Sequence, residues 1–231
     1  MTPEKVAWIT IGILLLSNVI GLIYSMVVLK STVFSSFRIQ TKPYRNGLFS
    51  ERMPLFLLNF VLLLGVSGSG AYFLSDYLSF ELNILTIVLQ VILAFVFDDI
   101  WFYFYHRWLH ENKFMLKHVH SIHHRATTPF PLEYLYGHPL EWMLGMIGVL
   151  IAFGIFFVFG GINAFAFWIF GLLRNLHEIH IHSDLKLPVI SKIPFISTTK
   201  HHDDHHSKLN GNYASTFHWL DKAFKTEFKD Q

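Results

Sequence analysis

The chain has 231 residues and a formal net charge of only +2 at pH 7, which argues against nucleic acid as a partner. Hydrophobic residues make up 52% of the chain and charged residues only 15%, well below the roughly 25% of a soluble domain, so the composition favours a membrane protein. Fifteen histidines and no cysteine exclude disulfides, thiolate-bound haem, iron–sulfur clusters bound by cysteine and cysteine zinc sites.

Five apolar segments are each long enough to cross a membrane, which takes about 20 residues. We expect them near residues 6–29, 54–75, 82–105, 140–159 and 161–180, with the last two joined as a hairpin at Gly160–Gly161. The first is too long for the apolar part of a secretory signal, so we expect it to stay as a membrane helix. The expected fold class is therefore all-α, a polytopic membrane protein of about five transmembrane helices.

Basic residues predict how these helices are oriented. The loop after the first segment and the stretch after the third are both basic, whereas the short loop after the second carries Asp76 and Glu81 and no basic residue. The excess of Lys and Arg in cytoplasmic loops then places the N-terminus outside and the C-terminal tail in the cytoplasm. Every histidine cluster then falls on the cytoplasmic side of the membrane. We expect that membrane to be the endoplasmic reticulum in a eukaryote or the inner membrane in a bacterium.

Three histidine motifs have spacings that suit a metal. His106 and His110 are four residues apart at the end of the third segment, so in a helix their imidazoles share one face. The pattern H-x-x-H-H occurs twice, in His120, His123 and His124 and again in His202, His205 and His206. If the first of these boxes is helical, its three imidazoles project from one face. Each motif alone could be a surface patch, but together they predict metal binding.

A fourth cluster closes the fifth segment, and carboxylates accompany the histidines. His182 is the first choice as a ligand, His180 the second and His177 the third, while Glu178 can ligate a metal or orient an imidazole. Two further carboxylates, Asp98 and Asp99, lie about two helical turns before His106, at a depth where a carboxylate normally has a protein partner. A structural interpretation pairs these carboxylates with Arg107 or with a neighbouring helix. The functional interpretation is that either Asp98 or Asp99 supports the metal-binding histidines, and Asp203 is a further candidate for such support.

The number of histidines predicts two metals. The first three motifs supply eight histidines, more than one ion takes, and adjacent pairs such as His123–His124 and His205–His206 point differently enough to serve neighbouring ions. Zinc usually needs three or four ligands, so the surplus favours two irons that activate oxygen, although zinc can replace iron in purified protein.

The ordered set of motifs resembles the sterol desaturase and fatty acid hydroxylase superfamily of membrane di-iron oxygenases, most closely its C4-methylsterol oxidase branch. The resemblance covers about residues 90–227. Its motifs stand here as Asp98–His110, the two H-x-x-H-H boxes, Tyr136–Glu141, His182-Ser183 and Asn212–Asp221. One departure is Asp184, where relatives have glycine after His-Ser.

This resemblance implies a histidine-rich cytoplasmic cap that holds two irons, with residues 1–80 as N-terminal membrane helices and 81–231 as the catalytic domain. The implied ligands are His106, His110, His120, His123, His124, His182, His202, His205 and His206, with His138 as a plausible addition and no catalytic residue beyond the ligands. The implied reaction is O2-dependent hydroxylation or desaturation of a sterol or another membrane lipid, with electrons from a separate protein because the chain has no flavin, nucleotide or haem motif.

Two other functions remain open from the residues alone. A zinc-dependent membrane hydrolase would use a carboxylate such as Glu178 as general base. A metal transporter would spread its histidines through the depth of the membrane, whereas here they gather at one side, which argues against it.

Overall fold

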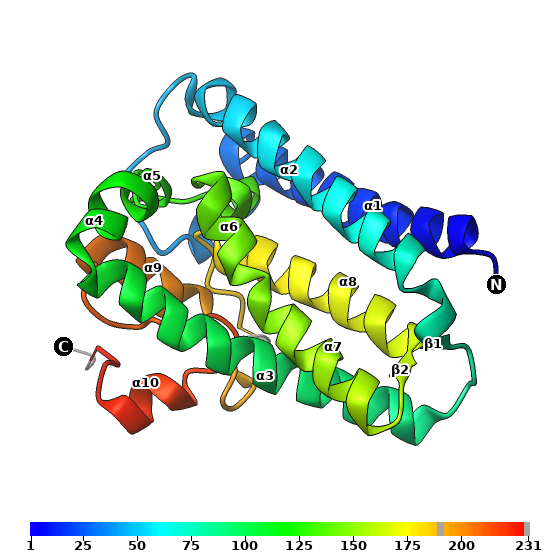
Figure 1. Ribbon diagram of the computed structural model, residues 1–231. Helices are drawn as coiled ribbons and strands as arrows, with labels where there is room; N and C mark the ends of the chain where they lie inside the picture. Colours follow the sequence, from blue (N-terminus) through cyan, green and yellow to red (C-terminus); the bar gives the residue numbers. More distant parts are fainter. Residues whose placement is uncertain (189–191, 229–231) are drawn as a thin grey trace.

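The computed structural model describes residues 1–188 and 192–228, and long helices that run side by side make up most of this part of the chain (Figure 1). The long helices are α1 (Pro3–Lys30), α2 (Leu48–Phe73), α3 (Ile84–Glu111) and α8 (Ala164–Ile181), together with α6 (Pro139–Gly145), which continues almost directly into α7 (Ile147–Phe159). The predicted all-α membrane fold is confirmed.

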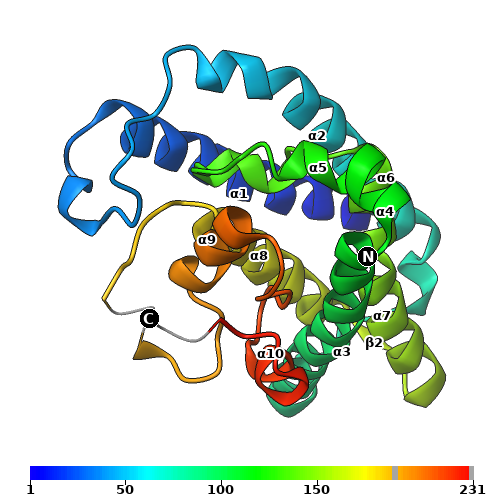
Figure 2. The same ribbon diagram turned by 90° about the vertical axis from the view of Figure 1, so that its left-hand side faces the viewer.

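Shorter elements gather at the two ends of this bundle. Strands β1 (Leu78–Ser79) and β2 (Ile162–Asn163) pair in parallel at the end where the N-terminus lies. The opposite end carries α4 (Lys113–Met115), the π-helical turn η3 (Leu116–His120), α5 (Ser121–His123), the 3-10 turn η4 (Pro131–Leu135), α9 (Thr199–Lys208) and α10 (Trp219–Phe224). Figure 2 looks onto that end, which holds the histidine boxes. The remaining 3-10 turns are η1 (Ser35–Phe37) and η2 (Ser75–Tyr77).

Within residues 1–188 and 192–228, four helical stretches are long and apolar enough to cross a membrane, one fewer than predicted: α1, α2, α3 and the α6–α7 pair. The fifth predicted segment does form a helix, α8, but its second half carries Arg174, Asn175 and Glu178, which lower its hydropathy. It packs against α1 and α3 inside the bundle, so neighbouring helices rather than lipid meet much of its surface.

Side chains and glycines account for the helix boundaries. Asn83 accepts a hydrogen bond from the backbone nitrogen of Thr86, and Asn163 accepts hydrogen bonds from those of Phe165 and Ala166, which satisfies free donors at the starts of α3 and α8. The predicted hairpin at Gly160–Gly161 is present, and both glycines have positive φ angles that a side chain would strain.

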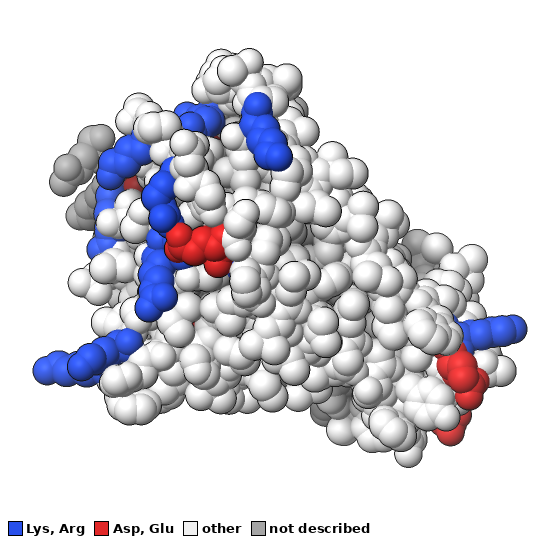
Figure 3. Space-filling model, turned by 90° about the horizontal axis from the view of Figure 1, so that it is seen from above, with Lys and Arg blue, Asp and Glu red and all other residues white. Residues whose placement is uncertain are grey.

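The surface charge also fits a membrane position. Figure 3 shows Lys and Arg side chains gathered over the histidine-bearing end, a few charges at the other end and an uncharged band between them. Large apolar side chains are exposed along the helices, among them Ile23, Val61, Leu150 and Val158, each at least 60% exposed. An apolar surface of this extent is suited to lipid rather than water.

The loop between α1 and α2 is anchored to the segment after α8 by Asp184. Its carboxylate accepts hydrogen bonds from Arg38 Nε at 2.8 Å, the Gln40 backbone nitrogen at 2.7 Å and the Tyr44 hydroxyl at 3.2 Å. Its φ of +58° lies in the left-handed region, which favours glycine over residues with a side chain. In this chain the aspartate accepts that backbone conformation and adds an anchor for the loop.

Candidate metal centre

Nine buried histidines meet in two adjacent groups at one end of the bundle. Within each group the ligand nitrogens lie within 4.8 Å of one another. The first group, group 1, contains His106, His110, His120, His124 and His205; the second, group 2, contains His123, His182, His202 and His206. The structure thus brings together nine of the histidines singled out from the sequence.

Each H-x-x-H-H box contributes two histidines to one group and one histidine to the other. His120 and His124, one turn apart, enter group 1, whereas His123 turns to group 2. In α9 the pair His202 and His206 enters group 2, and His205 reaches back to group 1. The three imidazoles of the first box therefore do not all enter one group, and the adjacent histidines diverge as predicted.

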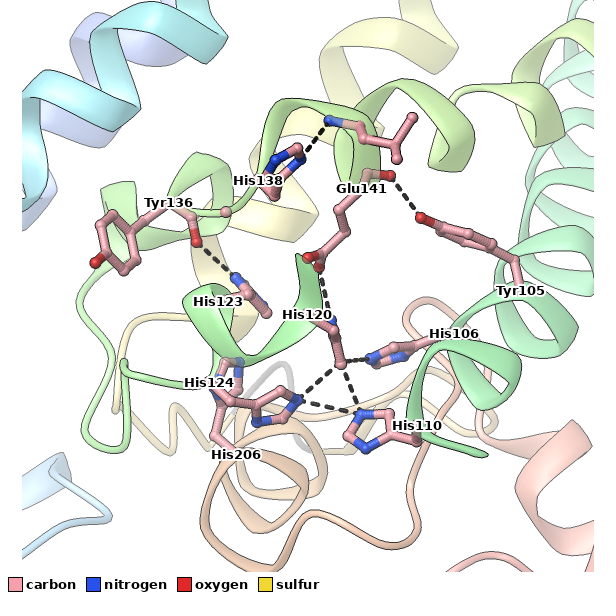
Figure 4. Close-up of polar contacts among 12 residues, drawn as sticks. Tyr105, His106, His110, His120, His123, His124, Tyr136, His138, Glu141 and His206 are labelled. Atoms are coloured by element: carbon pink, nitrogen blue, oxygen red, sulfur yellow. Dashed lines mark hydrogen bonds and ion pairs between the residues drawn. The ribbon is translucent and has the colours of Figure 1, made fainter. Parts of the chain in front are cut away.

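Carbonyl and carboxylate oxygens hold several rings of group 1 in one orientation. His106 Nδ1 donates to the Tyr213 carbonyl at 2.7 Å, and His205 Nδ1 donates to the Gly211 carbonyl at 2.7 Å. His120 Nδ1 lies 2.9 Å from Glu141 Oε1 (Figure 4). With Nδ1 used in this way, the Nε2 atom of each ring faces the group without a proton.

Group 2 is held by the same device. His123 Nδ1 donates to the Tyr136 carbonyl at 2.9 Å, and His182 Nδ1 donates to the carbonyl of Glu178 one turn earlier at 2.7 Å. The Nε2 atoms of this group converge. His182 Nε2 lies 2.9 Å from His202 Nε2 and 3.5 Å from His123 Nε2, and His206 Nε2 lies 3.1 Å from His202 Nε2.

Converging unprotonated nitrogens fit a metal cation. In group 1, His120 Nε2 lies 2.7 Å from His110 Nε2, 2.9 Å from His124 Nε2 and 3.2 Å from His106 Nε2. Nε2 of His205 is buried with no hydrogen-bond partner among the described residues. Burial lowers the pKa of both His120 and His205 to about 3, so the rings are neutral at pH 7 and free to ligate. Histidines without thiolates suit iron, zinc or copper.

Three predicted or possible ligands lie outside both groups. Instead, the His138 ring caps α6, where Nδ1 accepts from the Leu140 backbone nitrogen at 3.1 Å (Figure 4). His177 Nε2 lies 3.1 Å from the Ser215 carbonyl, and His180 contacts the Tyr24 hydroxyl at 3.3 Å. The structure therefore gives these histidines structural contacts rather than positions among the clustered rings.

The predicted supporting carboxylates act one step away from the histidines. Asp99 accepts a hydrogen bond at 2.8 Å from the backbone nitrogen of Thr216, and Glu178 accepts one from the Ser215 hydroxyl. Both therefore hold segment 213–216, whose Tyr213 carbonyl orients His106.

The other two predicted carboxylates touch no clustered ring. Asp98 is paired with Arg174 of α8 at 2.6 Å and not with Arg107, whose partner is Glu111. Asp203 accepts two hydrogen bonds from Gln40 Nε2, at 2.8 and 2.9 Å, which tie α9 to the α1–α2 loop.

Two carboxylates with clear positioning contacts were missed in the sequence. Glu141 contacts His120 directly, and its place at the end of the motif Tyr136–Glu141 was the available signal. Asp221 accepts from the backbone nitrogens of Tyr213 and Ala214 at 2.8 and 2.9 Å, so it shapes the same segment that orients His106.

A cavity leads from the histidine groups into the bundle. This metal-side cavity is partly open, and its space of about 820 Å³ includes solvent at the opening; four of the clustered histidines and residues such as Leu63, Phe102, Met146 and Arg174 line it. A second, apolar cavity of about 550 Å³ continues between α1, α2, α7 and α8 and shares Leu63, Met146, Arg174 and Asn175 with the first. A long apolar molecule can therefore lie in the bundle with one end at the histidines.

Comparisons with known proteins point in the same direction. The sequence model of the fatty acid hydroxylase family matches residues 91–226, more than half of the chain. Methylsterol monooxygenase 1 of Rattus norvegicus is 38% identical over 134 residues, which cover 57% of this chain and 44% of that protein. A methylsterol monooxygenase of Aspergillus fumigatus is 34% identical over 151 residues, covering 63% of this chain and 50% of that protein.

A further similar protein carries a different name. A very-long-chain aldehyde decarbonylase of Oryza sativa is 37% identical over 146 residues, which cover 61% of this chain and 53% of that protein. The chain thus matches about half the length of each of these relatives. No solved structure matches it.

Proposed function

The chain belongs to the fatty acid hydroxylase family, and we propose that it is a membrane lipid oxidase that uses O2 at a centre of two irons. The observation that carries the proposal is the pair of interleaved, buried histidine groups, four of whose rings line a cavity that extends into the bundle. Nine neutral imidazoles exceed what one zinc ion takes, which supports two ions and oxygen chemistry.

We assign one iron to each group, with His106, His110, His120, His124 and His205 around the first and His123, His182, His202 and His206 around the second. Bound iron would supply the activation of O2 and the removal of hydrogen from an unactivated C–H bond. The chain itself orients the imidazoles through Tyr213, Gly211, Glu141, Tyr136 and Glu178, and surrounds the substrate with apolar side chains that exclude water.

A methylsterol is the substrate class we favour, since two of the similar proteins are named methylsterol monooxygenases. The second candidate is a long-chain aldehyde or another straight-chain lipid, since a similar protein is named a very-long-chain aldehyde decarbonylase. Lipid profiles of cells with and without the gene distinguish them, and an unchanged content of oxygenated, demethylated and shortened lipids would contradict the oxidase proposal.

We place the active site on the cytoplasmic side of the endoplasmic reticulum membrane or of a bacterial inner membrane, with electrons from a separate protein. The basic side chains around the histidine-bearing end support this orientation. Residues 81–231 would form the catalytic domain, which agrees with the family match over 91–226.

Metal analysis of protein produced with ample iron tests the centre directly. We expect about two irons per chain, and about one after His205→Ala or His206→Ala, because these neighbours serve different groups. His118→Ala is the matched control, since His118 is exposed in the same histidine-rich segment and outside both groups. One tightly held zinc and no oxygen-dependent lipid product would instead favour the zinc hydrolase.

A further inference from the structure

Helix α8 presents a row of polar side chains to the metal-side cavity. Arg174, Glu178 and His182 follow one another at intervals of four residues, so they share one face of the helix, and all three line the cavity. His182 belongs to group 2, and Arg174 lies two turns, about 12 Å along the helix axis, farther into the bundle. The row therefore leads from the apolar cavity to the clustered histidines.

Arg174 is only partly used by the protein. Its Nε donates to Asp98 Oδ2 at 2.6 Å, and within the described part of the chain no other hydrogen-bond acceptor is recorded for its guanidinium, which has five donors. The side chain is 19% exposed although it lies inside the helical bundle, and it lines both cavities. An arginine at membrane depth that faces a cavity is a functional-site candidate because its burial in an apolar setting is costly.

The charges around this position select the kind of group that it can bind. Asp98 pairs with Arg174 and offsets its charge, and two further carboxylates, Glu141 and Glu178, line the same cavity as Arg174. A carboxylate or sulfate bound at Arg174 would therefore bring another acidic group into a cavity that already holds two. A neutral hydroxyl can accept a hydrogen bond from Arg174 and donate one to Glu178.

We propose that Arg174, positioned by Asp98, binds the hydroxyl oxygen of a neutral lipid and so fixes which carbon reaches the metal centre. This deepens the proposed oxidase function and rests on it. The apolar body of the lipid would fill the apolar cavity between α1, α2, α7 and α8. The separation of Arg174 from His182, about 12 Å along the helix axis, then sets how far from the hydroxyl the carbon lies that faces the histidines.

A purely structural ion pair is the alternative, so the test compares lipids that differ only in the polar group. One series is a 4,4-dimethylsterol with a free 3-hydroxyl, its 3-deoxy analogue and its 3-sulfate. The other is octadecan-1-ol, octadecane and octadecanoate. Equilibrium binding of tritium-labelled lipids to the purified full chain in one detergent gives affinity ratios within each series. Each lipid partitions into the detergent micelles equally for every protein variant, so a change in these ratios between variants reports on the protein.

The variants keep the charge of the cavity balanced. Asp98→Asn combined with Arg174→Gln removes both charges at once, so that neither is left buried and unpaired. Arg174→Lys keeps the charge but loses the planar fork, and serves if the double variant does not fold. Arg45→Gln is the matched control, because Arg45 forms an exposed pair with Glu51 far from both cavities.

In the wild type we expect the hydroxyl lipid to bind about 10- to 100-fold more tightly than its deoxygenated analogue, as for a hydrogen bond to a charged group. The anionic analogue should also bind more weakly than the hydroxyl lipid. The hydroxyl preference should fall below about threefold in the double variant, fall several-fold in Arg174→Lys and stay unchanged in Arg45→Gln.

Other outcomes separate this inference from the proposed function. A hydroxyl preference that survives in the double variant, or tighter binding of the anionic lipid, overturns the role of Arg174 and leaves the oxidase standing. Binding of the straight-chain series alone, with the expected ratios, removes the methylsterol assignment and supports Arg174. Failure of every lipid to bind the wild type contradicts both.

Discussion

Arg52 ties α2 to the segment that follows the first histidine box, and its replacement by methionine should destabilise the whole histidine-bearing end. Its side chain is buried, with only 6% of its surface exposed. Its Nε donates to Glu133 Oε1 at 2.9 Å, Nη1 to the Tyr136 hydroxyl at 2.6 Å and Nη2 to the Arg125 carbonyl at 3.1 Å. Tyr136 in turn orients His123 through its carbonyl.

The cost follows from what Arg52→Met leaves behind. Glu133 is fully buried, and breaking a buried ion pair by removing one partner costs about 3–5 kcal/mol. For a chain of this size each kcal/mol lowers Tm by about 2–4 °C, so the expected loss is about 6–20 °C. Arg52→Met combined with Glu133→Leu removes both charges and should recover most of this loss.

The destabilisation should also depend on pH. Burial raises the pKa of Glu133 to about 7 from an ordinary value of 4.5, although Arg52 opposes the rise. Between these two values the folded chain binds more protons than the unfolded chain, so this group's contribution to stability falls as pH rises. Without Arg52 the pKa rises further, so the loss relative to wild type should be larger at pH 8 than at pH 6.

Thermal unfolding of wild type and variants in one detergent, at pH 6 and pH 8, measures both effects. Arg45→Met is the matched control: its ion pair with Glu51 is exposed and screened by solvent, so its loss should leave Tm almost unchanged. A Tm for Arg52→Met within about 2 °C of wild type, or a double variant no more stable than the single one, would refute the reasoning.

Three further predictions concern the neighbourhood of the histidines. Glu141→Leu removes the acceptor of His120 Nδ1 and should weaken metal binding about 10- to 100-fold, while Glu141→Gln keeps an acceptor and should lose less metal affinity. Metal titration of the metal-free protein measures the affinities. Equal affinities of the wild type and Glu141→Leu would contradict the role of Glu141. Asp184→Gly suits the left-handed backbone but loses the ion pair with Arg38, so limited proteolysis should cut the α1–α2 loop faster, with Asp184→Asn intermediate. In the metal-free chain, the pKa values of His120 and His205 are lowered to about 3, so the unfolded state binds more protons than the folded state below pH 6.5. The Tm of the metal-free chain should therefore fall as pH drops from about 6.5. A Tm that stays constant between pH 7 and pH 5 would exclude this linkage.

Spacing along the chain was enough to find eight of the nine histidines that cluster, because pairs four residues apart share a helix face wherever the helix packs. His182 was chosen from the cluster that follows the fifth apolar segment and from the family resemblance. It could not show how they divide. The path of His123 away from His120 and His124 depends on the π-helical turn before it and on the Tyr136 carbonyl, neither of which has a pattern in the sequence. His138 lies outside both groups, and its Nδ1 caps α6 instead, a contact that a histidine before proline can also make.

The membrane helices were predicted from hydropathy, but their buried polar pairs were not. Asp98 was expected to need a partner, yet Arg174 lies 76 residues later, and only the packing of α3 against α8 brings them together. The same holds for Arg52 and Glu133, whose pairing depends on the position of η4 against α2. Contacts between distant segments arise from the packing of whole helices, which local patterns do not encode.

The exchange of histidines between the two boxes also orders events during biosynthesis. Groups 1 and 2 each need at least one ring from α9, which leaves the ribosome after every other clustered histidine. Neither histidine group can be completed while the earlier helices are inserting, so a metal bound as we propose would not be enclosed in a half-built bundle. Release of a stalled or truncated chain that ends before residue 202 would leave both sites incomplete at once, and such a chain should be recovered without tightly bound metal.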